Sequence, residues 1–230
     1  MDKLSTGAEC FDELLDGGYE KDIITTVYGP AGAGKTCLCL LAAIQAAKDK
    51  KIIYIDTEGG FSASRLKQLT PHHKEVLDKI FFLRPTNFEA QKEAFEKLRS
   101  MINDKIGLVI VDTISMLYRL ELGKDSVYDV NRDLGKQLSY LVEIARKHSI
   151  PVLLTNQVYA DFANKEKTNM VGGDILKYSS KCLMELSVIG ESRRKAVIRK
   201  HRYLPYKELV FQIKEEGLVK FQKPRGFGLF

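Results

Sequence analysis

The 230-residue sequence contains no tryptophan, only six prolines and four cysteines, and no long apolar run. The cysteines form no C-x-x-C pair, so neither a disulfide framework nor a zinc knuckle is expected. A membrane-spanning helix needs about 20 apolar residues, and the N-terminus carries no apolar signal segment. These absences predict a reducing compartment, a cytoplasmic location and no membrane contact.

Acidic side chains are the minority among the charged residues. The sequence holds 36 Lys and Arg against 30 Asp and Glu, a net charge of +6. Such a balance mildly favours contact with a polyanion, although a solvated basic surface has the same composition. The length suits a single α/β domain. We expect residues 1–220 to form that domain and residues 221–230 to form a C-terminal tail.

The most informative segment is a complete phosphate-binding loop, Gly29-Pro30-Ala31-Gly32-Ala33-Gly34-Lys35-Thr36. Its glycines let successive backbone N–H groups face phosphate oxygens, Lys35 places a positive charge near the β- and γ-phosphates, and Thr36 offers a hydroxyl to Mg²⁺. An apolar β-branched run precedes the loop and an apolar helical segment follows it, as this motif requires. The sequence therefore predicts binding of a nucleoside triphosphate.

Apolar segments alternate along the chain as strands and helices. We expect strands at residues 23–28, 52–55, 81–83, 108–111 and 152–155, with helices at 9–16, 37–47, 86–102 and 129–148. Thr86 and Glu89 match a capping box at the start of the third helix. Later runs at 183–186, 196–198 and 209–213 are typical of antiparallel strands. The pattern predicts an α/β fold with a mostly parallel central sheet, flanked by helices and extended by antiparallel strands at its C-terminal end.

Polar residues follow several of the predicted strands, and in a parallel sheet these carboxyl ends line the ligand site. Glu58 follows the second strand and is suited to deprotonate the water that attacks the γ-phosphate. Asp112 ends the fourth strand and is placed to hold Mg²⁺ together with Thr36. Gln157 follows the fifth strand and is suited to sense the γ-phosphate. Glu58 also fits an exposed acid in a turn, and Gln157 also fits a solvent-facing amide in a loop.

Two other classes of nucleotide-binding protein fit less well. Asp56 and Gly59 match the D-x-x-G switch of GTPases, but the interval after Thr36 holds only one helix and one strand, which leaves no room for a first switch loop. The nearest guanine-type signature also has Lys167 where an Asp is required. Helicase-type ATPases place a Glu directly after the Mg²⁺-associated Asp, whereas Thr113 stands there in this sequence.

Motifs spread from Leu4 to about Gly217 resemble the RecA/RadA recombinase family. These motifs are Leu4-Ser5-Thr6-Gly7, Tyr54-Ile55-Asp56-Thr57-Glu58-Gly59, Ile110-Val111-Asp112 and Thr155-Asn156-Gln157-Val158. The resemblance implies a RecA-like P-loop NTPase core. Because this chain starts at the core, without the family's helix-hairpin-helix domain, it resembles the short archaeal paralogues of the family.

The resemblance also implies roles for individual residues. Segment 29–36, Glu58, Asp112 and Gln157 coincide with the family's phosphate, base, Mg²⁺ and sensor positions, with Lys35, Glu58 and Gln157 in the catalytic group. Arg65 matches an arginine that stacks on adenine. Pro205 resembles a proline that covers ATP bound to a neighbouring protomer, and the cations at 199–202 stand just before it.

Two loops hold single-stranded DNA in the family, and they correspond here to Leu120–Arg132 and Tyr159–Asp174. Lys165 and Lys167 in the second loop would give sequence-independent binding, but nearby acids dilute both loops. The densest basic segment is Arg193–Arg202. It could bind DNA, reach a neighbour's ATP, contact a protein or simply face solvent.

These observations support a nucleoid-associated, ATP- and Mg²⁺-binding accessory protein of homologous recombination and DNA repair, with weak ATPase activity. The resemblance implies contacts with the main RadA-type recombinase and with a Holliday-junction resolvase. Two alternatives stay open at this stage. One is an autonomous DNA-dependent ATPase that exchanges strands; the other is a module in which ATP sets the affinity for protein partners, with negligible hydrolysis.

Overall fold

A computed structural model describes residues 2–122, 126–160 and 168–222. The strands are β1 (Lys3–Leu4), β2 (Tyr19–Glu20), β3 (Ile24–Tyr28), β4 (Lys51–Asp56), β5 (Ile80–Leu83), β6 (Ile106–Asp112), β7 (Val152–Asn156), β8 (Val158–Ala160), β9 (Thr168–Met170), β10 (Cys182–Val188), β11 (Arg194–Lys200), β12 (Glu208–Lys214) and β13 (Gly217–Lys220). The helices are α1 (Glu9–Leu14), α2 (Lys35–Ala46), α3 (Ala63–Leu69), α4 (His73–Asp78), α5 (Phe88–Met101), α6 (Met116–Glu121), α7 (Val127–His148) and α8 (Gly173–Ser179).

Nine of the strands form the central sheet, in the order β13-β12-β11-β10-β3-β7-β6-β4-β5. The six strands from β10 to β5 are parallel to one another. The other three, β11 to β13, continue the sheet as antiparallel strands. The expected α/β fold with its antiparallel C-terminal extension is confirmed.

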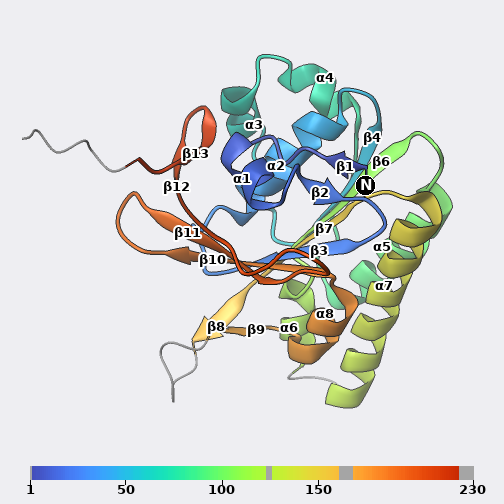
Figure 1. Ribbon diagram of the computed structural model, residues 1–230. Helices are drawn as coiled ribbons and strands as arrows, with labels where there is room; N and C mark the ends of the chain where they lie inside the picture. The colour runs from blue at the N-terminus through green and yellow to red at the C-terminus, as the bar shows by residue number, and fades with distance from the viewer. Residues whose placement is uncertain (1, 123–125, 161–167, 223–230) are drawn as a thin grey trace, which may run out of the picture.

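Helices cover both faces of the sheet (Figure 1). Helices α1 to α4 lie on one face, and α5 to α8 lie on the other. Successive side chains of a strand point to opposite faces. In β4, Ile52 and Tyr54 enter the hydrophobic core on the side of α1 to α4, while Ile53 and Ile55 enter the core on the side of α5 to α8. All four are fully buried. This explains why the parallel strands read as continuous apolar runs.

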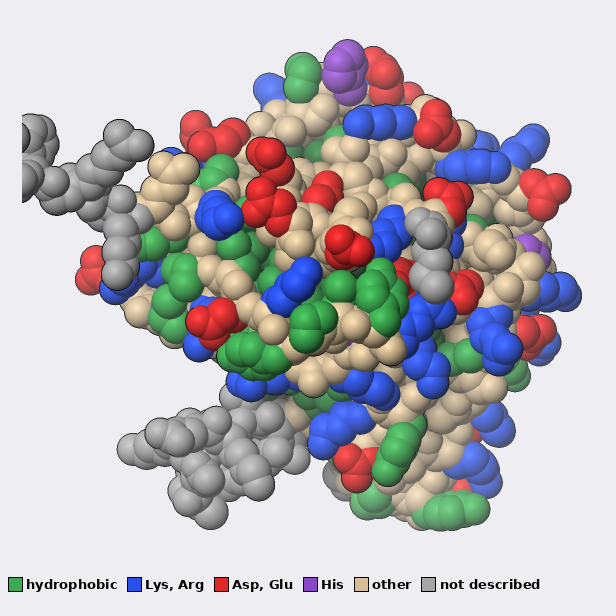
Figure 2. Space-filling model, viewed as in Figure 1, with side chains coloured by type: hydrophobic (Ala, Val, Ile, Leu, Met, Phe, Trp, Pro, Cys, Tyr) green, Lys and Arg blue, Asp and Glu red, His purple; other side chains and the backbone are tan. Residues whose placement is uncertain are grey.

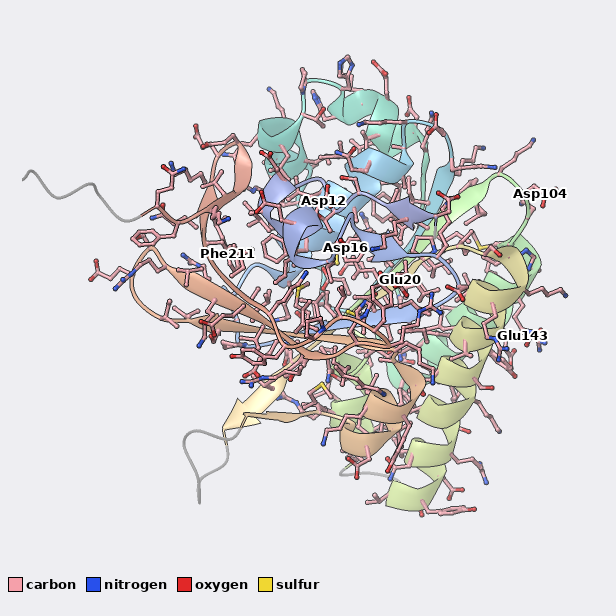
Figure 3. The ribbon with its side chains drawn as sticks, viewed as in Figure 1. Asp12, Asp16, Glu20, Asp104, Glu143 and Phe211 are labelled. Carbon is pink, nitrogen blue, oxygen red and sulfur yellow. The ribbon has the colours of Figure 1, made fainter. Side chains whose placement is uncertain are left out.

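The antiparallel extension packs against the start of the chain. Phe211 on β12, labelled in Figure 3, is fully buried and meets the ring of Phe11 on α1 edge to face, with the ring centroids 5.0 Å apart. Phe221 continues this attachment after β13, because its N–H donates to Val210 O at 2.9 Å. Residues 223–230 of the expected tail lie outside the described residues.

Three local expectations are corrected. The side chain that caps α5 is Asn87, which accepts from the N–H of Ala90 at 2.8 Å; the helix therefore begins later than a cap at Thr86 would allow. The segment Leu120–Arg132 is not mainly a loop: α6 ends at Glu121 and α7 begins at Val127. Buried Val130, four residues before buried Leu134, brings this first turn onto the core. Short helices α3, α4 and α8 were not expected.

None of the helices in the described part of the chain is long and apolar enough to cross a membrane.

Candidate nucleotide-binding site

The predicted phosphate-binding loop connects β3 to α2 at the carboxyl end of the parallel strands. Gly29 passes so close to β10 that a Cβ there would lie 2.3 Å from Leu186 O. Gly34 is the N-cap of α2 with a φ of 103°, a conformation that side chains rarely adopt. The two glycines are thus required by the backbone path. The helix N-terminus that follows presents free N–H groups, which suit an anion.

Lys35 begins α2 and lies folded over the loop. Its Nζ donates to Gly29 O and Pro30 O, both at 2.9 Å. Burial lowers the pKa of Lys35, while the nearby carboxylates of Glu58 and Asp112 act in the opposite direction. The ammonium is therefore held at the loop by the carbonyls of Gly29 and Pro30.

Asp112 closes β6 and is held at both carboxylate oxygens. Thr155 Oγ1 donates to Oδ1 at 2.5 Å, and Tyr54 OH donates to Oδ2 at 2.9 Å. The expected partner Thr36 lies on the other side of a small space. A Cβ placed on Gly60 would lie 3.7 Å from Thr36 Oγ1 and 3.9 Å from Asp112 Oδ2. A hydroxyl and a carboxylate facing one space are oxygen ligands of the kind that Mg²⁺ takes, so the residues present fit that ion.

Glu58 is joined to two residues from other strand ends. Its Oε1 accepts from Thr113 Oγ1 at 2.9 Å and from Gln157 Nε2 at 2.5 Å. Thr113 follows β6 and Gln157 follows β7, so the candidate base and the candidate sensor meet although 99 residues separate them. Buried Asp56 shapes the loop that carries Glu58, since its carboxylate accepts from the N–H groups of Gly60 and Phe61.

Arg65 lies on α3 beside the first turn of α2. Its guanidinium donates to the carbonyls of Lys214 and Glu215, which join β12 to β13, at 2.6 and 3.1 Å. Gln68 Oε1 and Cys37 Sγ accept from it as well, at 2.9 and 3.7 Å. Four of the five donors of an arginine are thus directed at its own chain.

The basic segment Arg193–Arg202 does not form one cluster. Strand β11 separates its two halves, and a seven-residue strand spans about 23 Å. Arg194 stands at the phosphate-loop end, where its Nε donates to Gly32 O at 3.2 Å. Lys200 stands at the opposite end, paired with Leu183 near the start of β10. Pro205 follows Lys200, beyond the end of β11 that lies opposite the phosphate-binding loop.

Most of these cations are engaged within the chain. Arg199 Nε contacts Glu185 at 2.5 Å, and Lys200 Nζ donates to Lys177 O and Ser180 O. Arg202 pairs at 2.6 Å with Glu20, whose side chain is 2% exposed. The face shown in Figure 2 has Lys and Arg side chains interspersed with Asp and Glu. The charges of Arg199 and Arg202 are balanced by the acids they contact.

Only parts of the two expected DNA loops can be located. The first is short, because α6 and α7 occupy most of Leu120–Arg132, and Arg132 is paired with Asp129 at 3.0 Å. The second contains the antiparallel pair β8 and β9 before α8. Lys165 and Lys167 lie outside the described residues, as do Phe162 and the side-chain surroundings of Tyr159, the two aromatic residues of this loop that could stack on bases.

Sequence reasoning missed several residues that contact the site. Tyr54 and Thr155 hold Asp112, and Thr113 holds Glu58. Tyr54 and Thr155 lie inside apolar strand runs, where they read as ordinary β-formers. Thr113 occupies the position at which helicase-type ATPases carry a glutamate. Two signals were available: Thr113 directly follows Asp112 at a strand end, and Tyr54 and Thr155 belong to the motifs that carry the family resemblance.

The chain has a parallel sheet with an antiparallel extension, a phosphate-binding loop after a central strand, and acids at the ends of neighbouring strands. Together these features define the class of RecA-like P-loop proteins. A family model described as Rad51 matches residues 1–221, and the chain belongs to this family.

Curated relatives agree with that assignment. The chain is 44% identical over 218 residues to the "DNA repair and recombination protein RadB" of Methanococcus maripaludis strain C7, covering 92% of this chain and 98% of the relative. It is 38% identical over 217 residues to the protein of that name from Methanobrevibacter smithii, covering 90% and 92%.

A solved structure described as "Crystal structure of the RadB recombinase" superposes with a TM-score of 0.81 at 34% identity, covering 95% of this chain and all of the other. The expected resemblance to the short archaeal paralogues is confirmed.

Proposed function

We propose that this chain binds ATP with Mg²⁺ and hydrolyses it slowly, as an accessory protein of DNA repair and recombination. The observation that carries the proposal is the convergence of Glu58, Gln157 and Lys35 beside the phosphate-binding loop. The charged base and the sensor share one hydrogen bond, 2.5 Å long, and Glu58 acts electrostatically on Lys35.

Each residue of the site has one role in this proposal. The N–H groups of residues 29–36 and the ammonium of Lys35 bind the phosphates. Thr36 and Asp112 hold the Mg²⁺, which when bound neutralises charge on the phosphate oxygens. Glu58 orients a water and takes its proton through Oε2, since Oε1 already accepts from Thr113 and Gln157. Arg65 supplies a flat face for the adenine.

Gln157 is the residue proposed to report the state of the phosphates. Its side chain contacts Glu58, and its backbone carbonyl accepts from the N–H of Val171 at 3.2 Å, beyond β9. A movement of this side chain is therefore passed to the β8–β9 hairpin. Because this hairpin carries the second expected DNA loop, we propose that nucleotide state alters a weak, sequence-independent contact with single-stranded DNA.

The proposed place in recombination follows from family membership and from the names of the relatives. The proposed protein partners are the main RadA-type recombinase and a Holliday-junction resolvase. The division into a core of residues 1–220 and a tail of residues 221–230 also stays a proposal.

The rate of ATP hydrolysis by the purified chain, with and without single-stranded DNA, tests this function. Lys35→Ala is the blank, because it removes the phosphate-binding ammonium. A slow rate of hydrolysis that exceeds the rate of the Lys35→Ala variant and changes little when DNA is added supports the accessory role. Strong stimulation by DNA favours the autonomous recombinase instead. Binding of ATP with a rate no higher than the blank favours the ATP-gated module. Pull-downs lacking both recombinase and resolvase at physiological salt contradict the proposed partners.

A further inference from the structure

The hydroxyl of Tyr54 contacts Asp112, one of the two residues of the proposed Mg²⁺ site. Tyr54 lies on β4, and Asp112 lies on the adjacent strand β6. The register pairs Tyr54 with Ile110 and Asp56 with Asp112, so Tyr54 and Asp112 are diagonal neighbours on the same face of the sheet. Tyr54 is fully buried, and its hydroxyl donates to Asp112 Oδ2 at 2.9 Å.

The ring of Tyr54 is locked by two other aromatic side chains. Phe61 meets it edge to face with a centroid distance of 5.4 Å, and Phe82 on β5 lies 5.7 Å away. Phe61 and Phe82 also pack edge to face on each other, at 4.6 Å. A ring held on two sides presents its hydroxyl in one direction, so the hydrogen bond to Asp112 has a fixed orientation.

The oxygen that Tyr54 holds is the one that faces Thr36. The space beside Gly60 has Asp112 Oδ2 and Thr36 Oγ1 on its border, whereas Oδ1 of Asp112 receives the hydroxyl of Thr155. With one donor on each oxygen, the carboxylate cannot rotate freely. Oδ2 keeps lone-pair capacity for a second partner, because a carboxylate oxygen accepts more than one contact.

We propose that Tyr54 is a positioning residue for the bound Mg²⁺: its hydroxyl orients the Asp112 oxygen that completes the metal site with Thr36. This inference rests on the proposed function, because it needs nucleotide with Mg²⁺ at this site. Partners that orient a metal ligand typically change metal affinity by about 10–100-fold when they are removed.

The Tyr54→Phe variant tests the assignment, because it removes only the hydroxyl and keeps the aromatic packing. Mn²⁺ binding to the full chain with a non-hydrolysable ATP analogue is measured by electron paramagnetic resonance, and nucleotide binding in EDTA is measured by fluorescence. We expect about 10–100-fold weaker Mn²⁺ binding with unchanged metal-free nucleotide binding. Unchanged Mn²⁺ affinity overturns the assignment, and so does an equal loss in both measurements, which indicates a packing role.

Tyr118→Phe is the matched control. It also removes a buried phenol that donates a hydrogen bond, to Asn131 Oδ1 at 2.6 Å, but on α6 at the other face of the sheet. We expect Mn²⁺ affinity to stay at the wild-type value, and a loss matching that of Tyr54→Phe overturns the assignment.

A double-mutant comparison separates this inference from the proposed function. In an Asp112→Ala background, Tyr54→Phe should change Mn²⁺ affinity no further, because the carboxylate that the hydroxyl orients is absent. A further loss as large as in the wild-type background overturns the role of Tyr54 while leaving the proposed function intact. A wild-type chain that binds no nucleotide overturns the proposed function, and the assignment with it.

Discussion

Replacing Glu58 by Gln separates the hydrolysis of ATP from its binding. In the structure Oε1 of Glu58 accepts from Thr113 Oγ1 and Gln157 Nε2. The carbonyl oxygen of a glutamine can accept both of these hydrogen bonds, so the side chain is expected to keep its position. What the variant loses is the charge and the ability to take a proton.

The expected magnitude follows from that loss. A general base contributes about 10²–10⁴-fold to a rate, which corresponds to about 2.7–5.4 kcal/mol of transition-state stabilisation. Binding of ATP should be no weaker. The carboxylate of Glu58 acts on Lys35, the residue that receives the phosphates, and removing a negative charge from this place removes repulsion of an anionic ligand.

Single-turnover hydrolysis of labelled ATP with the chain in excess is the suitable assay, since it detects rates far below those of steady-state methods. Fluorescence titration gives the affinity for nucleotide. Glu96→Gln is the matched control, because it makes the same chemical change at an exposed position of α5. A Glu58→Gln variant that hydrolyses ATP within about threefold of wild type would refute the reasoning, since a general base contributes more than that.

Three further perturbations have defined outcomes. Arg65→Ala should weaken the binding of ATP and of GTP by a similar factor, roughly two- to fivefold. Most in-plane donors of this arginine are already used, so it can stack on a base but has few donors left to distinguish adenine from guanine. Titrations of both nucleotides check this, and a loss confined to ATP contradicts it. Phe211→Ala should reduce the free energy of unfolding by about 3–5 kcal/mol, because the ring is fully buried. Chemical denaturation measures this free energy. A loss below about 1 kcal/mol would contradict the prediction and mean that the core collapses around the cavity. Burial lowers the pKa of His201 below its usual 6.5, with Glu20 opposing the shift. As pH falls below about 6.5 the unfolded chain therefore binds a proton that the folded chain resists, and stability falls. His201→Asn should flatten the decline of Tm between about pH 7.5 and pH 5.5 in calorimetry, and an unchanged slope excludes this histidine as its source.

The parallel core of the fold could be predicted because its signals are local. Segment 29–36 fixes a strand, a tight turn and a helix in succession, since only glycine allows the backbone path at Gly29 and Gly34. The apolar runs place the strands, and the order of strands and helices allows few topologies. Helix boundaries depend on more than local sequence, as the start of α5 shows. Thr and Asn are both good N-caps, and the path of the chain selects Asn87 over Thr86.

The sequence by itself determined the P-loop, the strands with their acidic ends and the family of the chain. Tertiary structure alone decided which side chains meet. Glu58 contacts Gln157 across 99 residues, and Tyr54 contacts Asp112 across 58, because parallel register brings the ends of distant strands together. The same geometry also separates residues that are close in sequence, because the cations of Arg193–Arg202 lie at opposite ends of β11. Local patterns report the shape of each element, whereas contacts between elements depend on register and packing, which no short window of sequence contains.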